Sequence, residues 1–163
     1  MIVLGIDPGI ANTGWGVVSG GPRPVAIAHG TITTSPRTAP ELRLAQIHAT
    51  ISTVLDEHEI TSVALEDLYF GKNTSSAIAV GQARGVSLVL AGLRGLECFS
   101  YTPQHIKQAV CGRGSAQKAQ VQRMIGALLR VEPATDHAAD ALAVALCHVQ
   151  RAPLALALKA AIR

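Results

Sequence analysis

The chain has 163 residues, of which 48% are hydrophobic and 3% are aromatic, and its formal net charge is +3. This length predicts one domain over 1–163, whose last residues, 151–163, either dock as a helix or fray. No apolar stretch approaches the roughly 18 residues of a membrane span, and no secretion signal is evident. The three cysteines are widely spaced and form neither a disulfide framework nor a CxxC motif. We therefore expect a cytoplasmic protein with no membrane partner.

The charge is unevenly distributed along the chain. Residues 1–71 carry three Lys or Arg against seven Asp or Glu, a balance of −4, whereas 72–163 carry eleven against four, a balance of +7. A basic half beside acidic residues suits a polyanion that is held by its backbone and attacked at one point. Solvated basic helix faces are also common, so the asymmetry alone does not decide between these interpretations.

The first predicted strand begins the chain and ends at Asp7, before Pro8-Gly9. Its apolar, β-branched residues indicate a strand buried on both faces, and Pro-Gly indicates a turn. A carboxylate at this position either serves a site at the edge of the sheet or only helps to form the turn. Strands predicted over 13–18 and 24–32 continue the first as an antiparallel meander.

A helix is predicted from about Glu41 to Glu59, and a fourth strand over 60–66 ends in Glu66. A helix between two strands of one sheet normally makes a right-handed crossover, so this strand should be parallel to the first. Parallel strands share their carboxyl ends, where α/β proteins bind ligands. We therefore expect Asp7 and Glu66 to emerge at the same edge of the sheet.

The loop predicted over 67–76 carries two of the four Tyr and Phe residues of the chain, Tyr69 and Phe70. Their residue types alone favour packing beneath the next helix, predicted over 75–93. The small residues of that helix allow close approach within the core or to a second copy of the chain. A fifth strand follows over 96–101.

A short helix over 103–110, a glycine-bracketed loop and a helix that runs to about Arg130 come next, with Ser115 as the expected cap of the second helix. The basic side chains that bracket this loop could attract phosphate, together with the backbone amides at a helix N-terminus. A solvated basic surface is the alternative. The basic side chains that bracket the loop are Lys107, Arg113, Lys118 and Arg123.

A last core helix is predicted over 137–150, with His137, Asp140 and His148 on one face. Asp136, in the first turn, is expected to cap this helix or to complement its dipole. His148 is expected to pack in the core. Asp140 is an acid on an otherwise apolar helix, and three such sheltered acids, Asp7 and Glu66 included, indicate a divalent metal ion.

Four segments together resemble the RuvC family of Holliday-junction resolvases: GIDPG at 5–9, ALE at 64–66, GQARG at 81–85 and HAADALA at 137–143. The resemblance covers almost the whole chain. It implies a ribonuclease-H-like α/β fold: a five-stranded mixed sheet flanked by helices, with the first three strands antiparallel and strands 1, 4 and 5 parallel. It also implies a homodimeric, Mg²⁺-dependent endonuclease that cuts four-way DNA junctions, with a branch-migration helicase as a further partner.

The resemblance also implies roles for individual residues. Asp7, Glu66 and Asp140 match the metal-binding acids, and His137 matches a fourth catalytic position that holds Asp or His in the family. Because imidazole is a poorer Mg²⁺ ligand than a carboxylate, we expect His137 to orient a reactant or to transfer a proton. Asp136 lies one place away and is not given this role.

The DNA contacts implied by the resemblance lie in two segments. The aromatic pair matches a loop that wedges into the junction, which replaces the packing interpretation, and two lysines match positions that hold DNA. Two further basic residues are added as candidate contacts because they neighbour these segments. The expected DNA-binding residues are Tyr69, Phe70, Lys72, Lys107, Arg113 and Lys118.

The three acids predict hydrolysis by two Mg²⁺ ions, with Mn²⁺ able to substitute. The resemblance implies that this hydrolysis leaves 5′-phosphate and 3′-hydroxyl ends. A two-fold dimer, with 81–92 as its candidate surface, would make paired cuts. One alternative is a non-catalytic junction-binding protein of the same fold. Another is an ATPase module of the actin type, which has a similar first strand and turn but needs two such halves around a nucleotide.

Overall fold

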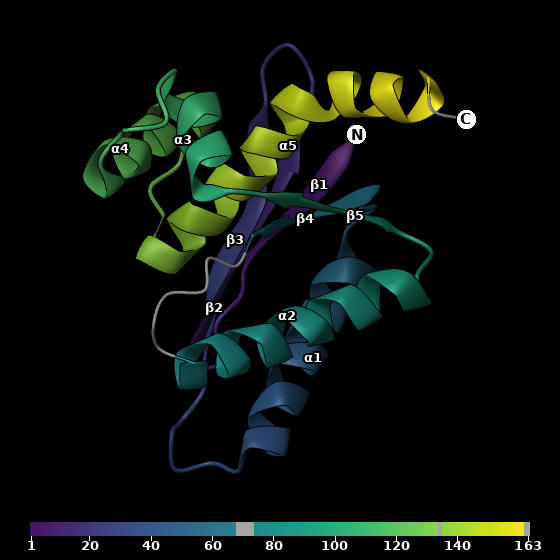
Figure 1. Cartoon of the computed structure of the whole chain (residues 1–163), viewed down its shortest axis with the longest axis vertical. Coiled ribbons are helices and arrows are strands. Elements are labelled where there is room, and N and C mark those ends of the chain that lie inside the picture. The colour runs from purple at the N-terminus through teal and green to yellow at the C-terminus, as the bar shows by residue number, and fades with distance from the viewer. Residues whose placement is uncertain (68–73, 134, 162–163) are drawn as a thin grey trace.

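The computed structural model describes residues 1–67, 74–133 and 135–161. Its strands form one sheet in the order β3-β2-β1-β4-β5 (Figure 1). The first three strands are antiparallel, and β1, β4 and β5 are parallel, as the sequence predicts. The strands are β1 (Ile2–Asp7), β2 (Asn12–Ser19), β3 (Val25–Thr33), β4 (Ser62–Glu66) and β5 (Glu97–Tyr101).

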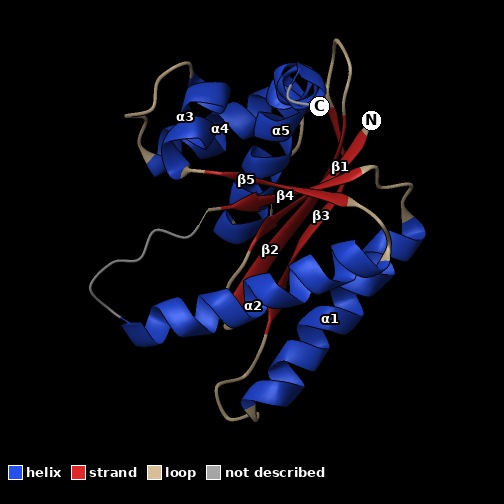
Figure 2. Cartoon of the chain, turned by 45° about the vertical axis from the view of Figure 1, so that its right-hand side comes forward, coloured by secondary structure: helices blue, strands red, loops and turns tan. Residues whose placement is uncertain are grey.

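Helices cover both faces of the sheet (Figure 2). One face carries the first two helices, and the other carries the last helix with α3 and α4 beside it. Within the described chain, no helix is long and apolar enough to cross a membrane. The helices are α1 (Pro40–Glu57), α2 (Thr74–Leu93), α3 (Pro103–Cys111), α4 (Lys118–Leu129) and α5 (Asp136–Ala161).

The sheet separates two apolar clusters, as its strands carry buried side chains on both faces. On one side, Leu4, Ile6 and Leu65 pack with α1 and α2. On the other side, Val3 and Ala64 pack with α3, α4 and α5. This alternation along β1 and β4 explains why both strands read as continuous apolar runs.

Two glycines of the sheet let α5 lie directly on β1 and β2. A Cβ atom at Gly5 would collide with the carbonyl oxygen of Ala141, and one at Gly14 would collide with that of His137. Gly14 pairs with Asp7 across the two strands. The missing side chains therefore bring the first turns of α5 beside the end of β1.

The expected cap of α4 is wrong. Ser115 lies in a turn, and α4 begins at Lys118 with the extended residue Gln117 as its N-cap and no side-chain capping bond. Ala116, between them, is only 1% exposed. Because Ala116 is buried and Gln117 is extended, the helix starts three residues after Ser115.

The last helix is longer than predicted, and Asp136 takes the second of its two expected roles, as an acid in the first turn that complements the helix dipole. Thr135 provides the side-chain cap, as its Oγ1 accepts the backbone N–H of Ala138 at 3.1 Å, and Asp136 lies in the first turn. At the other end, α5 continues to Ala161. Figure 1 shows α5 changing direction in its second half.

Candidate active site

Three acidic residues from three elements gather at the carboxyl ends of β1 and β4. The parallel register pairs Ile6 with Leu65, so Asp7 and Glu66 follow at adjacent positions along the same edge. The close packing of α5 on β1 and β2 adds Asp140, one turn into that helix. The negative charge of Asp140 raises the pKa of both Asp7 and Glu66, and the charge of Asp7 raises that of Glu66 as well.

Burial and mutual repulsion make the charged forms of two of these acids costly. Burial, followed by the neighbouring carboxylates of Asp7 and Asp140, raises the pKa of Glu66 to about 7. Burial also raises the pKa of Asp7 above its ordinary value, and the Asp140 charge adds to this, while the hydrogen bond from His137 opposes it. Such a cluster favours a bound cation, which would offset both effects.

His137 contacts Asp7 directly, with 2.9 Å between its Nδ1 and Asp7 Oδ2. An ionised carboxylate can only accept, so in that state Nδ1 carries the hydrogen and donates it. The imidazole then offers its second nitrogen, Nε2, to a further group. The side chain of His137 is 40% exposed, so a substrate can reach it.

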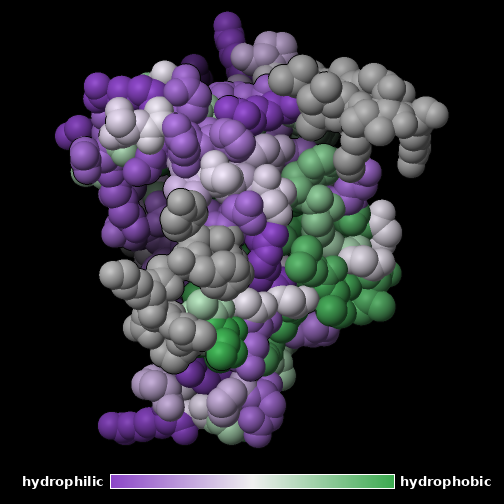
Figure 3. Space-filling model, in the orientation of Figure 1, coloured by the Kyte–Doolittle hydropathy of each residue, from purple (hydrophilic) through white to green (hydrophobic). Residues whose placement is uncertain are grey.

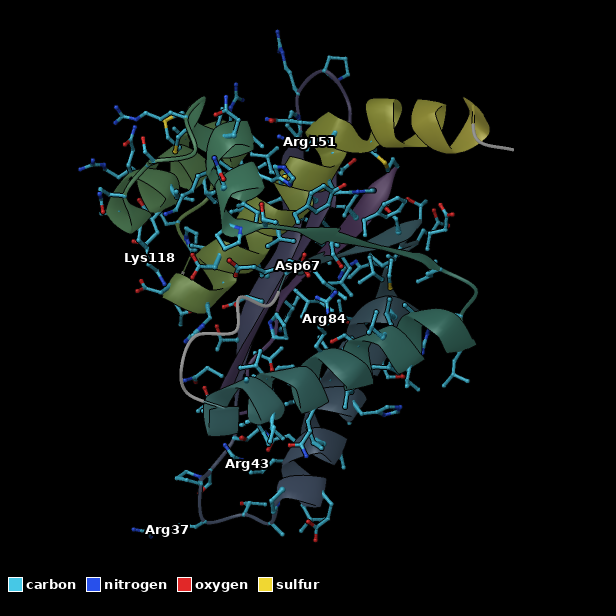
Figure 4. All side chains as sticks on the ribbon, viewed as in Figure 1. Arg37, Arg43, Asp67, Arg84, Lys118 and Arg151 are labelled. Carbon is cyan, nitrogen blue, oxygen red and sulfur yellow. The ribbon has the colours of Figure 1, made fainter. Side chains whose placement is uncertain are left out.

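Lys118 contacts the acidic residues from the side of α4. Its Nζ donates to Asp140 Oδ2 at 2.7 Å and lies 3.8 Å from Asp136 Oδ2. The hydrogen bond to Asp140 raises the pKa of Lys118, which keeps the ammonium group charged. Figure 4 shows Lys118 beside the first turns of α5. The side chain is half-exposed and can also face a phosphate.

A cavity of about 300 Å³ opens between β4, α3, α4 and α5. Two carboxylates and two ammonium groups line it, together with apolar side chains. Opposite charges around one cavity suit a phosphodiester, whose oxygens bind cations and whose phosphorus is attacked beside the acids. The lining residues are Glu66, Pro103, Ile106, Lys107, Lys118, Val121, Asp140 and Ala143.

The structure thus brings together most of the residues expected at the site. Arg113 is exposed and donates to Gln120 Oε1 at 2.7 Å, away from the cavity lining. Three expected DNA contacts, Tyr69, Phe70 and Lys72, lie outside the described residues. His148 is 2% exposed and hydrogen-bonds Ser62 and Tyr101, which confirms that it packs. The grouped residues are Asp7, Glu66, Lys107, Lys118, His137 and Asp140.

The carboxylate oxygens of the three acids are suitable ligands for a hard divalent cation, but their present positions do not form a coordination site. In residues 1–67, 74–133 and 135–161, no three His, Cys, Asp or Glu side chains stand ready to hold a metal ion. Asp140 is instead paired with Lys118, and Asp7 with His137. The oxygen donors of these three acids match Mg²⁺, provided that these two contacts are exchanged for the ion.

Sequence reasoning missed two supports of the site. The Thr135 cap also contacts Thr31 of β3 through its hydroxyl group, at 2.5 Å, which fixes the start of α5. Arg84 of α2 donates to the main-chain oxygen of Glu66 at 2.8 Å. The GQARG segment marked Arg84 as part of a pattern, but its spacing carried no indication of this partner.

The sheet order and the acids at the ends of β1 and β4 define a ribonuclease-H-like protein with a nuclease-type acidic site. The family model for the crossover junction endodeoxyribonuclease RuvC matches residues 3–148. This chain therefore belongs to the RuvC family of crossover junction endodeoxyribonucleases.

Individual relatives agree with this assignment over nearly their whole length. A RuvC of Moorella thermoacetica is 48% identical over 158 residues, which cover 94% of this chain and 93% of the relative. A RuvC of Natranaerobius thermophilus is 44% identical, with 92% and 95% covered. The structure of Thermus thermophilus RuvC in complex with a Holliday junction substrate matches with a TM-score of 0.90 and 36% identity, covering 95% of this chain and 96% of that one.

Proposed function

We propose that this protein resolves four-way DNA junctions by cutting them symmetrically at the acidic site. The observation that carries the proposal is the convergence of Asp7, Glu66 and Asp140, together with Lys118, in a chain of this family. Membership in a family of endonucleases, with one relative crystallised on a Holliday junction, supports the choice of substrate.

Asp7, Glu66 and Asp140 are the residues that would hold Mg²⁺, two ions to a site, with Mn²⁺ as a substitute. Asp7, which is electrostatically coupled to both other acids, is the natural shared ligand. When bound, the two ions would neutralise charge on the phosphate and lower the pKa of the attacking water.

His137 is proposed to orient a water molecule or to transfer a proton beside the reacting phosphate. Its Nδ1 is occupied by Asp7, which fixes the ring and leaves Nε2 to orient water or to protonate the leaving 3′ oxygen. Its position as a hydrogen-bond partner of Asp7 favours this role over that of a metal ligand. The products would carry 5′-phosphate and 3′-hydroxyl ends.

Basic and aromatic side chains are proposed to hold the junction. Lys107 and Lys118 line the cavity and can bind phosphate oxygens on either side of the cut. Arg113 is exposed on the neighbouring loop and would contact the DNA backbone further out. For Tyr69, Phe70 and Lys72 the proposal rests on the sequence pattern. An aromatic ring there would stack on a base that has lost its neighbour at the point of strand exchange, and such stacking contributes about 1–3 kcal/mol.

A homodimer is proposed, with α2 at its two-fold axis. The helix exposes large apolar side chains, including Ile78, Val89 and Leu93, which are 60%, 58% and 74% exposed. Gly81, Gly85 and Gly92 leave open space above the same helix, which allows a second backbone to approach closely. Figure 3 shows a hydrophobic patch over the part of this face where the second half of α2 lies in Figure 1.

The protein would act as a single domain over residues 1–163, in the cytoplasm. A helicase that moves the branch point is proposed as a partner because this chain belongs to the RuvC family. The non-catalytic alternative is disfavoured because all three acids are present together with His137.

A synthetic four-way junction tests the proposal, with a linear duplex of the same sequence as the control. With Mg²⁺, the purified protein should cut the junction at paired symmetric positions that ligase can seal, and should leave the duplex intact. Binding of the junction without any cleavage, across Mg²⁺ and Mn²⁺, would instead support the junction-binding alternative. ATP turnover without DNA would support the ATPase alternative.

A further inference from the structure

Arg84 connects α2 to the end of the strand that carries Glu66. Its Nη1 donates to the main-chain oxygen of Glu66 at 2.8 Å, and its Nη2 donates to Ser100 Oγ of β5 at 2.5 Å. The same Nη2 lies 3.9 Å from the carboxylate of Asp67. Figure 4 shows Arg84 reaching from α2 toward Asp67. One guanidinium group thus joins α2, β4 and β5 directly behind the acidic site.

The Glu66 carbonyl needs such a partner because the sheet is ending at this point. The β1–β4 ladder stops at Ile6 and Leu65, one residue before Glu66. On the other side, Glu66 pairs with Tyr101, and the N–H of Asp67 donates to the Tyr101 oxygen at 2.8 Å. The orientation of the Glu66 peptide decides where its carboxylate points, so the Arg84 bond bears directly on the site.

The arginine is well placed to act as a rigid clamp. Its side chain is only 16% exposed, and the preceding residue, Ala83, is fully buried against the sheet. Hydrogen bonds from a sheltered guanidinium group are strong, and the planar fork holds two acceptors at a fixed spacing. A lysine at this position could keep the charge but not both contacts.

We propose that Arg84 is a positioning residue that fixes the direction of the Glu66 carboxylate and thereby sets the affinity of the acidic site for divalent metal ions. The proposal rests on the proposed function only in taking Glu66 as a metal ligand. Arg84 acts entirely through the main chain of Glu66 and the side chain of Ser100. This role explains why the GQARG segment, which contributes no acid to the site, is one of the four segments that carry the family resemblance.

The test measures Mn²⁺ binding to the purified protein without DNA, by calorimetry or by electron paramagnetic resonance. Arg84→Ala should weaken Mn²⁺ binding about 10-fold or more, the usual effect of removing a group that orients a ligand. Arg84→Lys should fall between this variant and the parent. A higher Mn²⁺ concentration should also restore most of the junction cleavage that Arg84→Ala loses.

Arg94 offers a matched control in the turn directly after the same helix. Its Nη2 donates to Ser52 Oγ and to Asp56 Oδ1, each at 2.7 Å, so it ties the end of α2 to α1 without touching β4. Arg94→Ala removes an equivalent clamp and should leave Mn²⁺ affinity unchanged. A general loosening of α2 would affect both variants, whereas positioning of Glu66 affects only the Arg84 variants.

Two results would overturn the proposal: Mn²⁺ binding by Arg84→Ala as tight as that of the parent, or an equal loss in Arg94→Ala. Should Arg84→Ala fail to fold, Arg84→Lys and Arg94→Lys decide by the same comparison, and equal affinities refute the role. Because Mn²⁺ binding needs no DNA, this outcome is separate from that of junction cleavage, whose failure would count against the proposed function alone.

Discussion

Glu66 is the acid whose protonation responds most strongly to its surroundings. Burial and the Asp7 and Asp140 carboxylates raise its pKa to about 7, so the metal-free protein holds a proton there close to neutral pH. A bound dication would reverse this balance by favouring the charged form. The site therefore gains affinity for metal as the pH rises, and the same group should affect the stability of the metal-free protein.

Replacement of Glu66 by Gln should stabilise the metal-free protein at pH 8 but not at pH 5. The folded-state pKa of about 7 lies above the ordinary value of 4.5, so the folded protein binds more protons between these values. The associated stability is present below pH 4.5 and is lost as the pH rises through 7. At pH 8, Glu66→Gln should raise the Tm by roughly 3 °C, about 1 kcal/mol after allowance for solvent screening.

Thermal unfolding in EDTA at both pH values checks this prediction. An unchanged or lower Tm for Glu66→Gln at pH 8 would mean that the carboxylate is not strained in the metal-free site. A shift of equal size at pH 5 and pH 8 would mean that the substitution acts through packing.

His137→Ala should slow junction cleavage by about 10²–10⁴-fold, the usual contribution of a positioned proton donor or acceptor. Junction affinity should change little, because the basic side chains remain in place. Single-turnover cleavage and gel-shift titration measure the two effects. His48→Ala, at an exposed position on α1, is the control and should cut like the parent. A His137→Ala variant with the parental rate would exclude His137 from the chemistry.

At the scale of elements, the convergence of Asp7 and Glu66 could be predicted because a right-handed crossover makes β1 and β4 parallel. The position of Asp140 beside these two acids could not be derived in this way, since it depends on how closely α5 lies on the sheet. Gly5 and Gly14 permit this approach, but glycine is also common in turns and strands that no helix covers so closely. The resemblance to a family supplied what the local pattern lacked.

Other features depend on tertiary contacts that spacing alone does not encode. Lys118 pairs with Asp140 over 22 residues of chain, and Arg84 reaches a carbonyl group, which every residue possesses. Ser115 has the residue type of a cap, but burial of Ala116 shifts the helix start past it. The helix also continues beyond Pro153, where a local rule would end it.

Gly14→Ala tests the close approach of α5 to β2. The new Cβ atom would collide with the carbonyl oxygen of His137, so α5 must shift. We expect a loss of about 1–3 kcal/mol in the free energy of unfolding, together with slower cleavage. His48→Ala is the control, since its side chain is exposed on α1. Denaturant unfolding that shows equal stability for the two variants would contradict this account of the packing.

For the whole molecule, Val89→Asp should convert the proposed dimer into a monomer. Val89 is 58% exposed on α2, and a charge there would be buried without a partner in the proposed interface. Light scattering should give the monomer mass, and paired cuts should become single nicks. Leu42→Asp is the matched control, because Leu42 is 60% exposed on α1. A dimeric Val89→Asp variant would move the interface elsewhere.

The central claim is that the carboxylates at the ends of β1 and β4 perform the cleavage while other groups hold the junction. The most direct measurement compares Asp7→Asn with the parent for both binding and Mg²⁺-dependent cutting of a four-way junction, with Asp56→Asn as an exposed acid control on α1. The account predicts that Asp7→Asn binds the junction as the parent does and leaves both strands intact, while Asp56→Asn cuts normally. Cleavage by Asp7→Asn at the parental rate would contradict it.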